Sequence, residues 1–100
     1  MYKELYYNDD LENLAEEIVF EQIHLLINDS ETEVPTSEVS IQDIAAIALN
    51  NMPPKYVCNF LEKREPGDQL KEEVKDLQKY AKRQVLKAIK KVKSTPHDLR

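Results

Sequence analysis

The sequence Ile41-Gln-Asp-Ile-Ala-Ala-Ile-Ala-Leu-Asn-Asn-Met-Pro-Pro-Lys-Tyr-Val57 decides how this chain folds. Its first part predicts a helix, because Ser40 stands before it as a cap and Asp43 follows three residues later. Apolar side chains recur at helical spacing, and Ala46 and Ile47 make the opposite side apolar as well. A helix that is apolar nearly all round is buried by more than one neighbour. We therefore expect this segment to be the central helix of a small helical domain.

The end of this helix is equally well marked in the sequence. Asn50 and Asn51 are suited to end it, since asparagine tolerates the left-handed backbone of a helix cap. Residues 53–54 are both proline and forbid its continuation, because proline lacks a backbone N–H and clashes with the preceding turn. Lys55 and Tyr56 are therefore expected at a defined place beside the helix end.

Two further helices are predicted on either side of the central one. The first carries an apolar stripe from Leu11 to Ile27, with Asp9 or Asp10 as its cap and residues 28–29 as its end. The last opens at Gly67 or Asp68 and carries a stripe at steps of three and four residues from about residue 70 to residue 93. It is longer than so small a domain needs. We expect its last two turns to overhang the body or to pack against a second copy.

The remaining segments are expected to connect these helices. The N-terminal residues 2–7 have the spacing of a single helical turn that packs back on the body, and residues 29–39 are polar, contain Pro35 and predict a loop. Residues 56–61 are rich in β-forming side chains and are either extended or a short helix. A turn is expected at residues 62–67.

The fold class that follows is all-α. One hundred residues with a single glycine predict one helical domain of three to four helices over residues 1–94, followed by a flexible tail at 95–100. A chain this short covers a two-sided apolar helix poorly, so we expect a homodimer whose interface resembles a core cut in half.

The central string from Asp43 to Val57 resembles the signature of the ComFB (late competence development) family of small bacterial proteins. The segment from Leu11 to Ile23 is similar to the first helix of that family. Many members carry several cysteines in the loop that corresponds to residues 29–39, where they look like a metal or redox cluster. This chain has none there, and its two histidines are isolated, so we expect no metal ligands and no structural zinc.

Catalytic patterns are missing from the sequence. It contains no H-E-x-x-H, G-x-S-x-G, C-x-x-C or P-loop string, and Cys58 has no base near it, which favours a buried thiol over a nucleophile. We therefore expect a protein that is not an enzyme and uses no cofactor. We expect the protein to lie in the cytoplasm, because it has a lone cysteine and the N-terminus has no apolar signal core. We expect no membrane partner, since no apolar run approaches the ~18 residues of a membrane span.

Charge divides sharply along the chain. Residues 1–69 hold 4 Lys and Arg against 15 Asp and Glu, a balance of −11, and residues 70–100 hold 10 against 4, a balance of +6. Two interpretations remain open. Either the two halves complement each other, within the monomer or across a dimer, or the basic side chains of the last helix meet an anionic partner: Lys79, Lys82, Arg83, Lys87, Lys90, Lys91 and Lys93.

The candidate ligand site is the corner after the central helix, with candidate residues Asn50, Asn51, Lys55, Tyr56 and Arg64. The asparagines offer donors and acceptors for base edges, the cations offer charge for phosphate, and the tyrosine offers a ring for stacking. A helix C-terminus is slightly negative, so phosphate needs a nearby cation there, and the basic last helix of either subunit can supply more.

The resemblance implies a ligand class, because some ComFB proteins are described as receptors for cyclic dinucleotide second messengers. The family usually has arginine where this chain has Lys55, and lysine binds phosphate as a point charge without the two-pronged geometry of arginine. The first hypothesis is therefore a receptor for cyclic di-GMP or cyclic di-AMP that signals to an unknown protein partner. The alternative is a dimeric helical adaptor that binds no small ligand. Nucleic acid is not the expected partner, since the net charge is −5.

Overall fold

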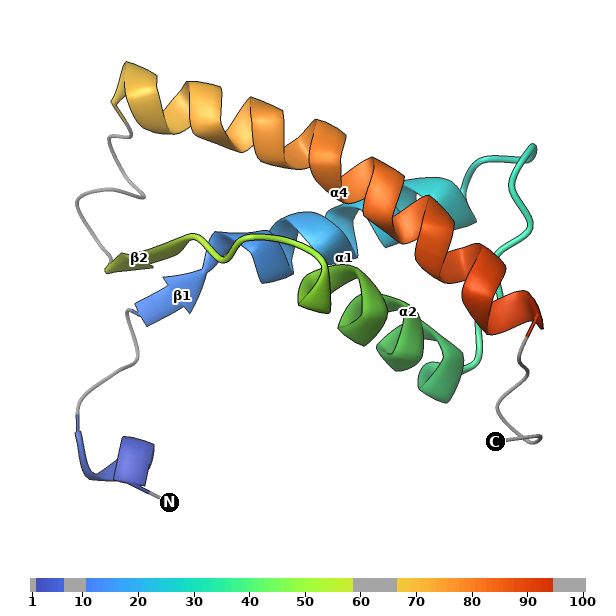
Figure 1. Cartoon of the computed structure of the whole chain (residues 1–100), viewed down its shortest axis with the longest axis horizontal. Coiled ribbons are helices and arrows are strands. Elements are labelled where there is room, and N and C mark those ends of the chain that lie inside the picture. Colours follow the sequence, from blue (N-terminus) through green and yellow to red (C-terminus); the bar gives the residue numbers. More distant parts are fainter. Residues whose placement is uncertain (1, 7–10, 59–66, 95–100) are drawn as a thin grey trace.

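The computed structural model describes residues 2–6, 11–58 and 67–94. Within these ranges the chain is mostly helical (Figure 1), which confirms the predicted class of small helical domain. The sequence did not predict its short antiparallel sheet. The elements in chain order are η1 (Tyr2–Leu5), β1 (Leu11–Asn13), α1 (Leu14–Ile27), α2 (Glu38–Asn50), β2 (Tyr56–Cys58) and α4 (Asp68–Ser94).

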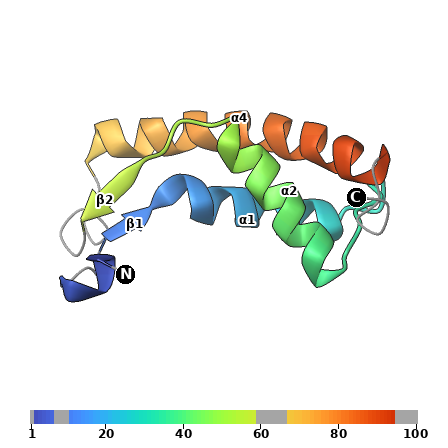
Figure 2. The ribbon, with the colours of Figure 1, turned by 60° about the horizontal axis from the view of Figure 1, so that its bottom comes forward.

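The helices form two layers, with α4 lying along α1 and α2 (Figure 2). The molecule measures 42 × 35 × 20 Å, and its shortest dimension matches two helices of about 10 Å each. The fully buried side chains Val19, Ile23, Ile44 and Val85 meet between the layers. Small residues at the contact, such as Ala48 and Ala81, let the helix backbones approach closely.

The segment expected to be central, α2, has two neighbours, α1 and α4, as its apolar pattern predicts. However, α4 packs against α1 and α2 more extensively than those two helices pack against each other, and its buried residues begin at Ala81. Ala46 on the far side of α2 is exposed, and Ile47 is half-buried. The second apolar side of α2 is therefore only partly covered within this chain.

Two of the three predicted helix starts need correction, whereas α4 begins at Asp68 as predicted. The first helix begins at Leu14 rather than after Asp9 or Asp10, because Leu11–Asn13 pairs with β2 and Asn13 becomes the cap. α2 begins at Glu38, two residues inside the predicted loop. Its cap is Ser37, whose hydroxyl accepts a hydrogen bond from the Ser40 backbone N–H at 3.1 Å, and Ser40 lies within the first turn.

The sequence left open whether residues 56–61 are extended or helical, and the sheet answers this for the first three of them. Tyr56–Cys58 is extended and pairs antiparallel with β1, with Leu11 opposite Cys58 and Asn13 opposite Tyr56. Alternate side chains of a strand point to opposite faces, so Val57 is buried while Cys58 is exposed. The prediction of a buried thiol was therefore wrong. Residues 59–61 lie outside the described ranges.

The C-terminal part of α4, and not its N-terminal part, is the part that packs on the other helices. Its buried residues begin at Ala81 and continue to Val92, whereas the helical residues before Ala81 include none that is buried. The last turns thus pack on the body of the same chain, and the expected overhang at that end was wrong.

The predicted turn at the N-terminus is present as η1, but its residues are not buried against the body. Apart from Gly67, the predicted turn at 62–67 lies outside the described residues, as does the tail at 95–100. No helix among the residues described is long and apolar enough to cross a membrane.

Candidate functional site

The corner between α2 and β2 starts from the predicted asparagines. α2 ends at Asn50, which is exposed, and Asn51 is its C-cap. The backbone of Asn51 has φ −111° and ψ 17°, so it is not the left-handed cap that the sequence suggested. Its side-chain amide instead donates a hydrogen bond to the carbonyl oxygen of Ile47 at 2.8 Å. This bond uses an N–H of the Asn51 side-chain amide. The carbonyl oxygen of the same amide takes no part in it and can accept a hydrogen bond.

Asn13 fixes the corner to the start of α1. Its side-chain oxygen accepts hydrogen bonds from the backbone N–H of Ala15 at 3.1 Å and from that of Lys55 at 2.9 Å. The backbone N–H of Leu14 donates to the carbonyl oxygen of Lys55 at 2.7 Å. One side chain thus caps α1 and holds the chain at Lys55, whose backbone is fixed beside the start of α1 by two hydrogen bonds.

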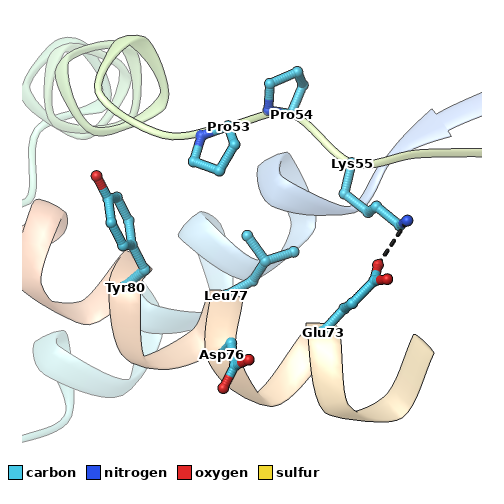
Figure 3. Close-up of a pocket in the computed structure, with 7 residues that line it drawn as sticks. All are labelled: Pro53, Pro54, Lys55, Glu73, Asp76, Leu77 and Tyr80. Atoms are coloured by element: carbon cyan, nitrogen blue, oxygen red, sulfur yellow. Dashed lines mark ion pairs between the residues drawn. The ribbon is translucent and has the colours of Figure 1, made fainter. Parts of the chain in front are cut away.

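The Lys55 ammonium lies 2.6 Å from a carboxylate oxygen of Glu73 on α4 (Figure 3). This hydrogen-bonded pairing holds the pKa of the Glu73 carboxyl below its ordinary value. The positive charge of Lys55 is therefore already compensated by a residue of the same chain. Tyr56 is next to it on β2 and is 61% exposed, and Arg64 lies outside the described residues.

A first hollow, here called the corner hollow, lies beside this ion pair and has a volume of about 330 Å³. Figure 3 shows the Tyr80 ring rising from α4 towards Pro53, with Leu77 between Tyr80 and Glu73. The lining residues are Pro53, Pro54, Lys55, Glu73, Asp76, Leu77 and Tyr80. Two carboxylates and one ammonium group belong to this lining, and this negative balance makes the corner hollow unsuited to a phosphate.

A second hollow, here called the lysine hollow, has a volume of about 310 Å³ and is lined by Ile47, Asn51, Tyr80, Gln84, Lys87 and Lys91. Its lining contains two ammonium groups and no carboxylate. Tyr80 lines both hollows. An aromatic ring, two amides and two cations are the groups that bind the base and phosphate parts of a nucleotide.

A comparison with protein-family models matches the family described as late competence development protein ComFB over residues 12–96. This chain belongs to the ComFB family. The match includes α1, α2, β2 and α4, and so every element that lines the two hollows. Neither the search of curated proteins nor the search of solved structures returned a match.

The structure of this ComFB protein brings together only part of the predicted site. Of the residues Asn50, Asn51, Lys55 and Tyr56, Asn51 lines the lysine hollow and Lys55 lines the corner hollow. Lys87 and Lys91 were predicted only as members of a basic helix. Tyr80 and Gln84 were not predicted as site residues. A signal for them exists in the sequence, because 73, 77, 80, 84, 87 and 91 follow one another at steps of four and three along one flank of α4.

No group of three or more metal-ligating side chains occurs in the part of the chain that the structure describes. The His24 ring lies 3.3 Å from the Asn28 side-chain amide on the exposed side of α1. The expectation that this ComFB protein binds no zinc remains a prediction for metal analysis.

Proposed function

We propose that this ComFB protein is a non-enzymatic receptor for a cyclic dinucleotide second messenger, cyclic di-GMP or cyclic di-AMP. The observation that carries the proposal is the lysine hollow, in which Asn51 and Tyr80 lie with Lys87 and Lys91. The resemblance of the central segment to a family in which some members are described as cyclic dinucleotide receptors supports the same ligand class. The family description adds late competence development as the process that such a receptor serves.

Each part of the ligand finds a chemical counterpart in the lysine hollow. Lys87 and Lys91 are four residues apart on α4, so their side chains are neighbours on one face and suit closely spaced phosphates. Tyr80 is 40% exposed and offers a ring on which a purine can stack. Asn51 and Gln84 offer amide groups for a base edge, and the Asn51 carbonyl is free of the bond that its amide makes to Ile47.

This assignment moves the phosphate contacts away from Lys55, on which the sequence hypothesis centred. An ammonium group already paired with Glu73 attracts a phosphate less than an uncompensated one. We therefore give Lys55 a positioning role, in which its ion pair fastens the corner to α4. Lys87 and Lys91 take the phosphate-binding role. A receptor of this kind also fits the cytoplasmic location that the sequence predicts.

Calorimetric titration with cyclic di-GMP and cyclic di-AMP tests the proposal. The parent should bind one of them, and Lys87→Ala and Lys91→Ala should each weaken binding and reduce its dependence on salt concentration. Tyr80→Ala should weaken binding through the loss of about 1–3 kcal/mol of stacking. Lys82→Ala is the matched control, since Lys82 is an exposed lysine of α4 that lines neither hollow.

Two results separate the possible sites. If Lys55→Ala and Tyr56→Ala abolish binding while the Lys87 and Lys91 variants bind as the parent does, the ligand sits at the corner that the sequence indicated. If the parent binds neither dinucleotide, the receptor proposal is wrong.

A helical adaptor without a small ligand is the second candidate, and the outer face of α1 favours it. Phe20 is 43% exposed and Leu25 is 55% exposed, although both are large and apolar. Protein interfaces are enriched in aromatic side chains, so the exposed ring of Phe20 suits a protein partner. Capture of a specific protein partner that survives Lys87→Ala and is lost in Phe20→Ser would support the adaptor.

A further inference from the structure

The C-terminal part of α4 carries positive charge that the rest of the described chain leaves almost uncompensated. After Asp76 the helix contains no aspartate or glutamate, and its basic residues are Lys79, Lys82, Arg83, Lys87, Lys90, Lys91 and Lys93. Within the described ranges, Lys93 is the one member of this set that makes an ion pair, with Glu33 at 3.6 Å. Compensation of the basic helix by the acidic first part of the same chain is therefore limited to Lys93 in the structure described.

Three of these cations form a row, here called the outer row, on the side of α4 that faces away from the other helices. The outer row consists of Lys79, Arg83 and Lys90. Each of the three lies two residues from a buried alanine, and two residues correspond to about 200° of rotation around a helix. All three are exposed, and α1 and α2 both lie on the other side of α4 (Figure 2). The row is about 17 Å long at about 1.5 Å per residue.

The exposed side chains around the outer row suit phosphate better than lipid or protein. From Ala81 to Ser94, every exposed residue of α4 is lysine, arginine or serine. A helix that lies on a lipid surface presents an apolar face to it, and lysine is depleted at protein interfaces. Phosphate groups, in contrast, bind lysine as a point charge and arginine through two hydrogen bonds. Non-specific binding of nucleic acid rests on contacts of this kind.

We propose that the outer row binds the phosphate backbone of double-stranded DNA. An α-helix with its side chains is about 10–12 Å wide. The major groove of B-form DNA is about 12 Å wide and admits such a helix, whereas the major groove of an RNA duplex is deep and narrow. Contacts to phosphate carry no sequence information, so the proposed binding is independent of DNA sequence.

The distribution of charge makes this partner compatible with the net charge of −5, from which the sequence led us to expect no nucleic acid. Exposed charges more than about 10 Å apart are largely screened at about 0.1 M salt. The molecule is 20 Å across in its shortest dimension, and the outer row faces away from the layer of α1 and α2. DNA at the row is therefore attracted by the nearby cations more strongly than it is repelled by the carboxylates of the other layer.

The proposal does not depend on the binding of a cyclic dinucleotide, since neither Lys87 nor Lys91 belongs to the outer row. Fluorescence anisotropy of a labelled DNA duplex of about 20 base pairs tests it, over about 50–200 mM salt and up to about 100 µM protein. The parent should bind the duplex. The logarithm of its association constant should fall with the logarithm of salt concentration with a slope of about −2.7 or steeper, which is about −0.9 for each of three phosphates.

Single substitutions then locate the contact. Lys79→Ala, Arg83→Ala and Lys90→Ala should each weaken binding about tenfold at about 50 mM salt and make the slope shallower by about 0.9. Arg83→Lys keeps the charge and should keep the slope. Circular dichroism should show parental folding, because all three side chains are exposed.

Lys75→Ala is the matched control for these variants. Lys75 is an exposed lysine of the same helix, but its ammonium group lies 3.7 Å from a carboxylate oxygen of Glu72. The substitution makes the same change in net charge outside the outer row. The Lys75 variant should therefore bind the duplex as the parent does.

Four results would overturn the inference. The first is a parent that does not bind the duplex at about 50 mM salt, or binds it without dependence on salt. The second is a loss of affinity in Lys75→Ala equal to that in the outer-row variants, which would make net charge the cause. The third is an RNA duplex that binds as tightly as DNA, since this contradicts the fit to the major groove. The fourth is binding to phosphatidylglycerol vesicles in place of DNA, which would assign the row to a lipid surface.

Discussion

Replacing Asn13 by alanine should destabilise the protein far more than its half-buried position suggests. The Asn13 side-chain oxygen accepts two backbone hydrogen bonds, from Ala15 within α1 and from Lys55 in the corner 42 residues away. Alanine removes the acceptor for both. The substitution thus uncaps α1 and loosens the attachment of the corner at the same time.

The magnitude follows from these two losses. An Asn-to-Ala change at a helix cap costs typically about 1 kcal/mol. A backbone donor left without its partner costs about 1–3 kcal/mol, and the lower end applies to Lys55 because water reaches this partly buried site. The free energy of unfolding should therefore fall by about 2 kcal/mol, which corresponds to a decrease of roughly 8–16 °C in melting temperature for a domain of this size.

Urea denaturation followed by circular dichroism measures this change, and Asn13→Asp is the matched control. Aspartate keeps the acceptor oxygen and places negative charge at a helix N-terminus, where it is favourable, so the Asp variant should be as stable as the parent. If Asn13→Ala changes the free energy of unfolding by less than about 0.5 kcal/mol, the value typical of an inert surface site, the proposed link between α1 and the corner is wrong.

Three further predictions concern the cap of α2, the Lys55–Glu73 pair and metal binding. Ser37→Ala should cost about 1 kcal/mol and Ser40→Ala clearly less, because Ser37 is the cap of α2; equal losses in thermal unfolding would contradict this. Because the Glu73 pKa is lowered in the folded state, the Lys55–Glu73 pair contributes stability above the ordinary pKa of glutamate and loses it as the pH falls through the lowered pKa. The parent should therefore be slightly more stable than Glu73→Gln at neutral pH, and this difference should disappear in acid; a pH-independent difference would refute the assignment. Metal analysis of protein purified without a histidine tag should find no zinc, and a stoichiometric amount would show a site that the sequence analysis missed.

The sequence was sufficient to predict the helices and the proline corner because those features are local. Helical spacing of apolar residues and the prolines at 53–54 act within a few positions of the chain. The starts of α1 and α2 were misplaced for different reasons. At α1 the strand pairing between Asn13 and Tyr56 took the residues that would have begun the helix. At α2 Ser37 and Ser40 are both good caps, and local propensity does not choose between them.

The binding site was only partly predictable, because it depends on contacts between distant segments. Lys55 is an isolated cation in the sequence, and its pairing with Glu73 emerges only when α4 crosses the corner. Tyr80 and Gln84 lie on the flank of the apolar stripe of α4, where sequence gives no sign of which helix will be adjacent. Asn51 was found because a helix end followed by prolines is exposed in any fold of this kind.

The central claim is that a cyclic dinucleotide occupies the lysine hollow, and an NMR titration tests it most directly. The side-chain amide signals of Asn51 and Gln84 should shift on addition of cyclic di-GMP or cyclic di-AMP, together with backbone signals around Tyr80, Lys87 and Lys91. The signals of the outer face of α1 should remain in place. Unchanged spectra with both ligands, or shifts that leave Asn51 and Gln84 unaffected, would contradict the assignment of this site.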